Sequence, residues 1–505
     1  MKRLKNLVLK DSWKFVLLLL LISIPIFQYL GSQAIRLFDE ARLANNAYEM
    51  YHSGLSIVTT YGGKPDMCNT KPPLLIWLQV LSMKVAGINE TGLRLPSAFA
   101  AFFTCILLLL LGWRYMKEFW VGFIWVFVLI TSMGYFDVDH LHCIRSCDYD
   151  ALLTFFLTWA AITFFLFFET TKKKHIYFFF VSMALAVLTK SAAALMVLPG
   201  FFIYTVIKKK VLLLLKSKDF YIGMFLFLLL TGSYYFLREI YNPGYLTAVW
   251  KNEFGGRFLG ILDGHSHSFW FYFENFTSTD ESITISNRFV RWMPLLPCGI
   301  LAGLLSKDVR IKNLTLFSTT VAITYFLVIS TAQTKLHQYD LPLYPFFAIL
   351  VGVFIHFIFS FLKDQKKILH YLKYNIVPYI FLFLLFITPY SEIVKKTYKP
   401  KEHPKFEEGY RINYYVRDII RGDRQWDNIS VLHDGYAADL RFYVNILNEK
   451  GKNITLKEAD KELETGEIVL CSQHGVKWYV EQNYEYNTLD EFHNIRVYEI
   501  MNKKE

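Results

Sequence analysis

Apolar residues occur along this chain in long runs that are separated by short charged tracts. Runs of about 18 or more apolar residues are typical of membrane-spanning helices. The run from residue 176 to 207 is too long for one helix, and we expect it to turn at "TKS". About eleven spans are therefore predicted, at residues 14–33, 95–113, 119–136, 150–168, 175–190, 191–207, 219–237, 290–305, 313–332, 339–362 and 375–391. The pattern predicts a mostly α, polytopic membrane protein.

The charge pattern sets the expected direction of these spans. The chain has a net charge of +11, although only 19% of its residues are charged and 54% are hydrophobic. The basic residues gather in short tracts between spans, such as "ETTKKKH" and "IKKKVLLLLKSKD". This is the positive-inside pattern, so we interpret the basic excess as topology and expect no nucleic-acid partner. We expect an uncleaved first helix, a cytoplasmic N-terminus and a periplasmic C-terminus, in the inner membrane of a cell.

Two long segments then fall on the outer side, residues 34–94 and 238–289. The first contains "EARLANNAYEMYH" and "PPLLIWLQVLSMKVAG", which are too short to cross and which predict amphipathic helices lying along the membrane surface. The second mixes glycine, histidine and aromatic residues, as a lid over a cavity would. After residue 394 the composition becomes mixed and charged. We therefore predict two domains, a membrane domain at 1–394 and a small periplasmic α/β domain at 395–505.

Within the C-terminal domain, alternating short apolar runs predict strands. These runs are "NISVLH", "NITL", "EIVLCS" and "NIRVYEI". The stretches "EEGYRINYYVRDIIRG" and "LKEADKELE" between them are predicted to be helical.

Several cations are expected at the outer edge of the membrane. They are Arg42, Lys71, Lys190, Arg257 and Lys335. Cations that converge on one cavity suit a phosphate diester, through charge-assisted hydrogen bonds. The alternative is that each side chain only reaches to the headgroup level, as lysine and arginine often do.

Carboxylates accompany these cations. Asp39 and Glu40 begin the first outer segment, and Asp148 and Asp150 lie at the outer end of another span. Carboxylates at membrane depth are costly, so they are functional candidates. Asp39 or Glu40 could act as a general base or hold a cation, whereas the alternative is simple pairing with nearby cations.

Histidines and cysteines offer weaker signals. His140, His142, Cys143 and Cys147 share the loop "HLHCIRSC", where a disulfide, free thiols or a bound metal are alternatives. No cofactor is expected to be required, and a divalent metal is an alternative. His265 and His267 in the second outer segment, together with Asp148, are candidates for the acceptor side of the cavity.

A series of motifs resembles a known family. These motifs are "FDEARLANNAYEM", "YGGKPD", "TKPPLLIWL", "RLPSAFAA", "CDYDALLTFF", "VLTKSAAALMVLPG", "EFGGRF" and "TKLHQYDLPLYPFFAIL". In this order and at these membrane positions they resemble the GT-C membrane glycosyltransferases. The closest groups are the ArnT-type aminoarabinose transferases of lipid A and the protein O-mannosyltransferases. The C-terminal domain also resembles the soluble outer domain that these enzymes carry.

The resemblance implies roles for individual residues. Asp39 matches the family's essential acidic residue, and Lys71 matches the lysine that contacts the donor phosphate. Arg42 and Arg257 match arginines near that phosphate. Tyr339 matches a tyrosine of the same cavity.

Three further candidates complete the site; Asp150 follows from the resemblance, whereas Lys190 and Lys335 come from the set of outer cations. Asp150, with Asp148 as the competing alignment, matches a second acidic residue and would join Asp39 and Glu40 as a catalytic candidate. Lys190 and Lys335 would add to the phosphate site.

Three positions depart from the family pattern. Leu43 replaces a tyrosine, Cys68 replaces an aromatic residue, and Thr70 replaces the acidic residue with which some ArnT-type enzymes hold zinc. These differences bear on aminoarabinose specificity and on that metal site, and they leave the phosphate chemistry intact.

The sequence thus predicts an inverting glycosyltransferase that moves a hexosyl or pentosyl group from a polyprenyl-phosphate donor. The acceptor is expected to be periplasmic, either lipid A or another glycolipid, or a protein. A polyprenyl-lipid transporter or flippase is the main alternative. It would show repeated halves and mid-span ionisable residues, and neither is clear in this sequence. A membrane-anchored assembly protein is a third interpretation.

Overall fold

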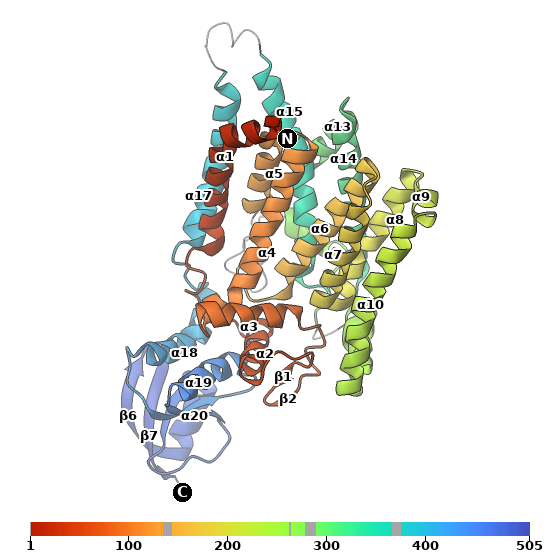
Figure 1. The fold of residues 1–505 in the computed structure, drawn as a ribbon. Helices are drawn as coiled ribbons and strands as arrows, with labels where there is room; N and C mark the ends of the chain where they lie inside the picture. Colours follow the sequence, from red (N-terminus) through yellow and green to blue (C-terminus); the bar gives the residue numbers. More distant parts are fainter. Residues whose placement is uncertain are drawn as a thin grey trace.

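The computed structural model is mostly helical, with a small sheet domain at the C-terminus (Figure 1). It describes residues 2–132, 134, 144–261, 264–277, 289–365 and 375–504, without the side chains of residues 2–11, 254 and 405. Within these ranges seven helices are long and apolar enough to cross a membrane. The predicted polytopic membrane fold is therefore confirmed.

Each predicted span contains an apolar helix of the structure. These helices are α1 (Lys2–Phe27), α4 (Glu90–Leu110) with the π-helix η1 (Leu111–Tyr115), α5 (Phe119–Ile130), α6 (Tyr149–Thr170), α7 (Lys174–Lys190), the 3-10 helix η2 (Ser191–Val197) with α8 (Leu198–Ile207), α10 (Lys218–Tyr241), α13 (Leu295–Leu304), α14 (Val309–Thr331), the 3-10 helix η4 (His337–Leu343) with α15 (Tyr344–Lys363), and α17 (Val377–Thr397). The short helix α9 (Val211–Leu215) follows α8.

The long apolar run of residues 176–207 reverses direction in the middle. Ser191 has a φ of 45°, a backbone conformation that breaks the helix after Lys190. Lys190 bonds Asp150 at the start of α6, whereas Lys210 donates to the carbonyl of Phe168 near the end of α6. Since these contacts lie at opposite ends of α6, α7 runs against α6, and η2 and α8 then run back along it.

The first outer segment forms two helices at one end of the bundle. These are α2 (Asp39–Ser53) and α3 (Leu74–Ala86), joined through a small hairpin of β1 (Thr60–Tyr61) and β2 (Lys64–Pro65). Figure 1 shows α3 lying across the ends of the spanning helices, as expected for a surface helix. The second outer segment contains α11 (Tyr245–Val249), the π-helix η3 (Trp250–Phe258) and α12 (Phe271–Thr277).

The C-terminal domain is a five-stranded mixed sheet with three helices. Its strands are β3 (Asn428–His433), β4 (Asn453–Glu458), β5 (Ile468–Cys471), β6 (Tyr484–Phe492) and β7 (Ile495–Lys503), and its helices are α18 (Pro404–Arg421), α19 (Ala438–Glu449) and α20 (His474–Asn483). The strand order is β4-β3-β5-β7-β6, with β4 and β5 parallel to β3 and with β7 antiparallel to both β5 and β6.

One secondary-structure prediction in this domain is wrong. The stretch "LKEADKELE" was expected to be helical, but its first three residues continue β4. The reason is tertiary, because the parallel pairing with β3 extends to Glu458 opposite His433 and commits these residues to the sheet.

The C-terminal domain is fixed to the membrane domain through buried polar contacts. The Arg417 Nε lies 3.0 Å from the Glu90 Oε1, and the Tyr443 hydroxyl donates to the same oxygen at 2.7 Å. The Tyr443 hydroxyl in turn accepts from the backbone amide of Ile35. Arg417 also donates to the carbonyls of Gly31 and Ser32. The C-terminal domain is therefore attached to the segment that leads into α2.

Arg417→Met should destabilise the whole protein. The substitution leaves Glu90 buried without its guanidinium, which costs about 3–5 kcal/mol when one partner of a buried pair is removed. A lower melting temperature in detergent is the expected result. Arg421→Met, at an exposed position one turn further along α18, is the matched control and should leave the melting temperature unchanged. Equal melting temperatures for the two variants would mean that this contact does not hold the domain.

Candidate active site

The start of α2 is held in place by a buried ion pair. Arg94 donates to both oxygens of Glu40, at 2.8 and 2.9 Å, and also to the carbonyls of Leu30, Gln33 and Ala34. Glu40 accepts in addition from the backbone amides of residues 36 and 147. Burial raises the pKa of the Glu40 carboxyl, but Arg94 and these amides outweigh burial and hold the pKa below its usual value.

Asp39 lies beside this pair but has a different environment. It is the first residue of α2 and is exposed, whereas Glu40 is 1% exposed. The residue before it, Phe38, has a φ of 70°, a strained conformation for a residue with a side chain. The structure thus presents the Asp39 carboxylate at a helix N-terminus and uses Glu40 to hold that terminus.

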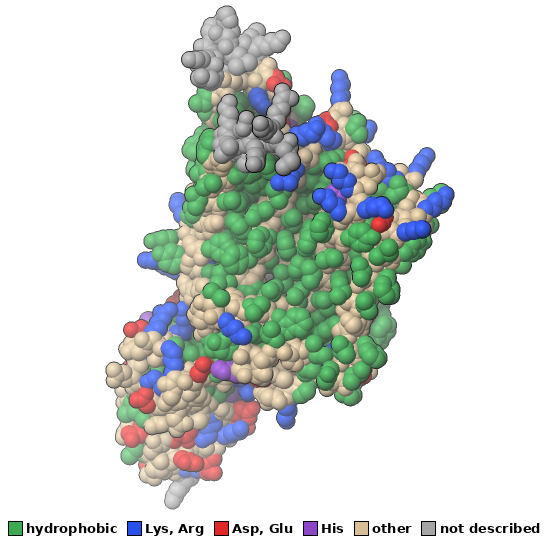
Figure 2. Space-filling view, viewed as in Figure 1, with side chains coloured by type: hydrophobic (Ala, Val, Ile, Leu, Met, Phe, Trp, Pro, Cys, Tyr) green, Lys and Arg blue, Asp and Glu red, His purple; other side chains and the backbone are tan. Residues whose placement is uncertain are grey.

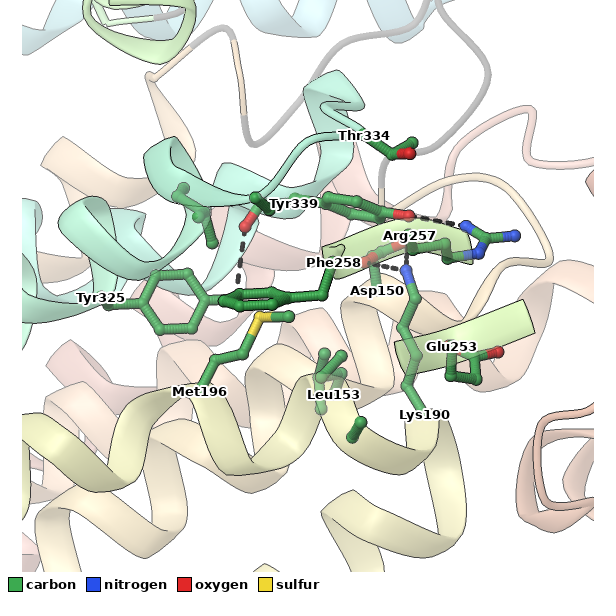
Figure 3. A pocket seen from close by; sticks show the side chains of 14 residues that line it. Asp150, Leu153, Lys190, Met196, Glu253, Arg257, Phe258, Tyr325, Thr334 and Tyr339 are labelled. Atoms are coloured by element: carbon green, nitrogen blue, oxygen red, sulfur yellow. Dashed lines mark hydrogen bonds and ion pairs between the residues drawn. The ribbon is translucent and has the colours of Figure 1, made fainter. Parts of the chain in front are cut away.

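Four of the predicted site residues line one cavity at this end of the bundle. Asp150, Lys190, Arg257 and Tyr339 come from α6, α7, η3 and η4, and Glu253 of η3 joins them (Figure 3). The cavity is narrow, about 40 Å³. Residues far apart in the sequence meet here because the start of α6, the end of α7 and the helices η3 and η4 converge at this end of the bundle.

Hydrogen bonds organise the cavity walls. The Lys190 Nζ donates to both oxygens of Asp150, at 2.6 and 2.7 Å, and lies 5.0 Å from the centre of the Tyr339 ring. The Arg257 Nη1 donates to the Tyr339 hydroxyl at 2.6 Å. The Arg257 Nε is buried and has no hydrogen-bond acceptor among the described residues. A buried donor of this kind is costly to leave unpaired, so it favours an anionic ligand.

Lys71 does not line the cavity itself but lies beside Glu253, which does. The Lys71 Nζ lies 3.8 Å from the Glu253 Oε1, which also accepts from the Thr70 hydroxyl at 3.1 Å. Burial raises the pKa of the Glu253 carboxyl, but Lys71 and Arg257 outweigh this and hold the pKa below its usual value. Glu253 therefore carries a negative charge between two cations.

Sequence reasoning missed Glu253 as a site residue. It lies in "NEFGGRF", which was identified for Arg257 alone. The structure places this stretch in a π-helix, a conformation that is frequent at functional sites. An acidic residue four positions before a candidate arginine was the available signal.

Arg42 lies on α2, with its own carboxylate partner. Its guanidinium donates to both oxygens of Asp66, at 2.8 and 2.7 Å, and lies 4.4 Å from the centre of the Tyr61 ring. Asp66 also accepts from Asn46. Arg42 therefore also fixes the loop that leads to Lys71.

The other predicted residues make structural contacts. The Lys335 Nζ donates to the backbone carbonyls of Ala332 and His267, at 2.7 and 3.2 Å. The ring of His267 stacks on Phe271 at 4.2 Å, and both His265 and His267 are exposed. Asp148 caps α6 by accepting from the amide of Tyr149. None of these four predicted residues is among the cavity-lining side chains, although Thr334 beside Lys335 is.

The predicted cysteine and histidine loop falls largely outside the described residues. His140, His142 and Cys143 are in the range that the structure does not describe, and Cys147 is a buried free thiol. Among the described side chains, no group of three or more His, Cys, Asp or Glu residues could hold a metal ion.

Comparison with known proteins identifies the fold. Residues 70–235 match the family described as dolichyl-phosphate-mannose-protein mannosyltransferase. Two structures of ArnT from Cupriavidus metallidurans, one bound to undecaprenyl phosphate and one in the apo state, superpose with TM-scores of 0.71 and 0.68. Each covers 97% of this chain and 98% of its own, at 14% sequence identity. The chain is a multi-pass membrane protein with an ArnT-like GT-C fold.

One sequence relative aligns with only a short part of this chain. An uncharacterised protein of Aquifex aeolicus (strain VF5) is 36% identical over 101 residues, which is 20% of this chain and 20% of that protein. The aligned part therefore spans about a fifth of the relative.

The two neighbouring carboxylates of α2 should respond differently to neutralisation. Glu40→Gln leaves Arg94 buried without its counter-charge and should cost about 3–5 kcal/mol of stability. Asp39→Asn is the matched control, because an exposed acid in a first helical turn contributes about 1 kcal/mol at most. Melting temperatures in detergent would measure the difference. Similar losses in both variants would contradict the assignment of Glu40 as the anchoring residue.

Proposed function

We propose that this chain is a membrane glycosyltransferase that takes a sugar from a polyprenyl-phosphate donor. The observation that carries the proposal is the buried Arg257 Nε, which has no acceptor among the described residues and lies in a cavity that also contains Lys190. The ArnT-like fold supports it, as does the undecaprenyl phosphate named for one of the ArnT structures. A phosphate oxygen would supply the acceptor that Arg257 lacks.

The proposed phosphate site consists of Arg257, Lys190 and Lys71. In the structure, Asp150 and Glu253 balance two of these three positive charges. One positive charge remains for the donor phosphate, and Arg257 can form a charge-assisted hydrogen bond with it. Because the cavity is narrow, donor binding must widen it. Lys335 and Arg42 would not contact the phosphate directly. They would instead hold the loops near the site in position.

Asp39 is the proposed general base. Its carboxylate would take the proton of an acceptor hydroxyl as the acceptor oxygen attacks the anomeric carbon of the donor sugar. The bond between that carbon and the phosphate oxygen breaks, and its electron pair leaves with the polyprenyl phosphate. Lys71 and Arg257 would stabilise the charge that develops on the phosphate. A single displacement of this kind inverts the anomeric configuration.

The proposed location is the inner membrane of a cell, with the C-terminal domain in the periplasm. Lysine and arginine side chains gather on the end of the molecule opposite this domain (Figure 2). By the positive-inside rule that end faces the cytoplasm. The donor phosphate and the transferred hexosyl or pentosyl group would then meet a glycolipid or protein acceptor on the periplasmic side.

Lys71→Ala should reduce sugar transfer by about 10²-fold or more, the scale of losing one electrostatic stabiliser in a water-excluded site. Purified protein would be assayed with a panel of polyprenyl-phosphate sugars and a membrane lipid extract, with products read by mass spectrometry. Lys84→Ala is the matched control, since Lys84 is exposed in the last turn of α3. Near-normal turnover by Lys71→Ala would count against the phosphate site.

Asp39→Asn should abolish the sugar-mass increment that wild type produces in the same assay, because the amide cannot accept the acceptor proton. Thermal stabilisation by the donor should persist in this variant, since Asp39 is not a proposed phosphate ligand. Full transfer by Asp39→Asn would exclude Asp39 as the base. Donor-induced stabilisation of wild type without transfer to any acceptor would favour a lipid transporter.

A further inference from the structure

A second cavity lies between the C-terminal domain and the turn that precedes Asp39. Its volume is about 750 Å³, within the usual range for ligand sites. One wall is formed by residues 36–38, which lead into α2, and the opposite wall belongs to the C-terminal domain. Both domains therefore contribute to one cavity. Phe38, which lines it, is the residue immediately before Asp39 in the chain.

The C-terminal domain presents the edge of its sheet to this cavity. His433 ends β3 and Asp434 follows it, while Ser472 and Gln473 follow β5, which lies parallel to β3. Open α/β sheets bind ligands at the carboxyl ends of their parallel strands, where loops and helix starts converge. The position of the cavity in this domain is therefore that of a ligand site.

The cavity combines aromatic faces with neutral hydrogen-bonding groups. The rings of Phe38 and Tyr436 stack at 5.9 Å with an interplanar angle of 10°, and both remain partly open to solvent, with exposed fractions of 61% and 38%. Gln473 and His474 add polar groups. The buried Asn494 Oδ1 accepts no hydrogen bond from any described residue, so a hydroxyl of a ligand could donate to it.

The charge of the lining disfavours an anionic ligand. Three acidic residues line the cavity, Glu408, Asp434 and Asp439. Among the described lining residues, Arg36 is the single lysine or arginine. Arg36 already forms an ion pair with Glu402. Burial raises the pKa of the Asp439 carboxyl, which accepts a hydrogen bond from the Asn413 amide. The walls are thus neutral to acidic, whereas the described residues that line the cavity around Arg257 include two cations and two carboxylates.

We propose that this cavity binds a neutral glycan of the acceptor, with a sugar ring held against the Phe38–Tyr436 pair and a hydroxyl directed to Asp39. Aromatic faces contact the C–H face of a sugar ring, while amide and imidazole groups bond its hydroxyls. Phe38 directly precedes Asp39 in the chain, so a sugar against Phe38 would lie next to the residue that carries the proposed base. This inference rests on the proposed glycosyl transfer.

Saturation-transfer NMR on the full chain in glycolipid-free nanodiscs tests the cavity without requiring turnover. The probes are maltose, lactose, N,N′-diacetylchitobiose and, as a cationic comparison, trilysine. Wild type should transfer saturation to the ring protons of at least one disaccharide. Gln473→Ala and Tyr436→Ala should each lose this signal while keeping the wild-type melting temperature.

The controls separate this inference from the proposed function. Gln482→Ala, at an exposed position in the last turn of α20, should keep the saccharide signal. Lys71→Ala should keep it too, since that residue belongs to the donor side. Saccharide binding that survives in both cavity variants would overturn the proposal. So would the absence of binding by any disaccharide, or a cavity-dependent signal from trilysine alone. Sugar transfer by wild type, measured separately, would then still support the proposed function.

Discussion

The buried guanidinium of Arg94 is the contact on which the arrangement of the candidate site depends. It bonds both oxygens of Glu40 and three backbone carbonyls of residues 30–34. Through Glu40 it also reaches the amide of Cys147, just before α6. Three segments that are distant in sequence are thus joined at one point. Removing two charges from water is costly, and the many hydrogen bonds of this pair offset that cost. The position of Asp39 follows from it.

A second constraint is the compensation of charge around the proposed donor site. Lys190 pairs with Asp150, Lys71 lies near Glu253, and each pair is mostly shielded from water. A cation at membrane depth without a partner would be costly, so the carboxylates hold these side chains in position before a donor arrives. Among the described residues Arg257 has no carboxylate within ion-pairing distance, and its hydrogen bond goes to the neutral hydroxyl of Tyr339. Among the described residues that line this cavity, Arg257 is therefore the cation without a carboxylate partner.

The sequence predicted the spans from local apolar patterns, and four of the residues that it named for the site line one cavity of the structure, namely Asp150, Lys190, Arg257 and Tyr339. Apolar runs identify helices, and charges at the ends of neighbouring spans are expected at one face of the bundle, but the pairing of Asp150 with Lys190 was not predicted. The partners of Glu40 and Lys71 could not be read in this way. Arg94 lies 54 residues from Glu40, and Glu253 belongs to a different outer segment from Lys71. Such pairs are fixed by tertiary packing, as is the strand that replaced the helix expected at residue 456.

The turn at Phe38 connects the second cavity to Asp39, which begins α2. On one side Arg257 and Lys190 give the proposed donor cavity its cations, and Asp39 is among the charges that raise the pKa of Arg257. On the other side the C-terminal domain supplies a neutral to acidic wall. The two sets of lining residues do not overlap. Substitutions in the loops after β3 and β5 would therefore act on the proposed glycan site without changing the residues proposed to contact phosphate. Arg417 and Tyr443 fix the C-terminal domain to the segment that leads into α2. These contacts hold the second cavity at a constant position relative to the start of α2.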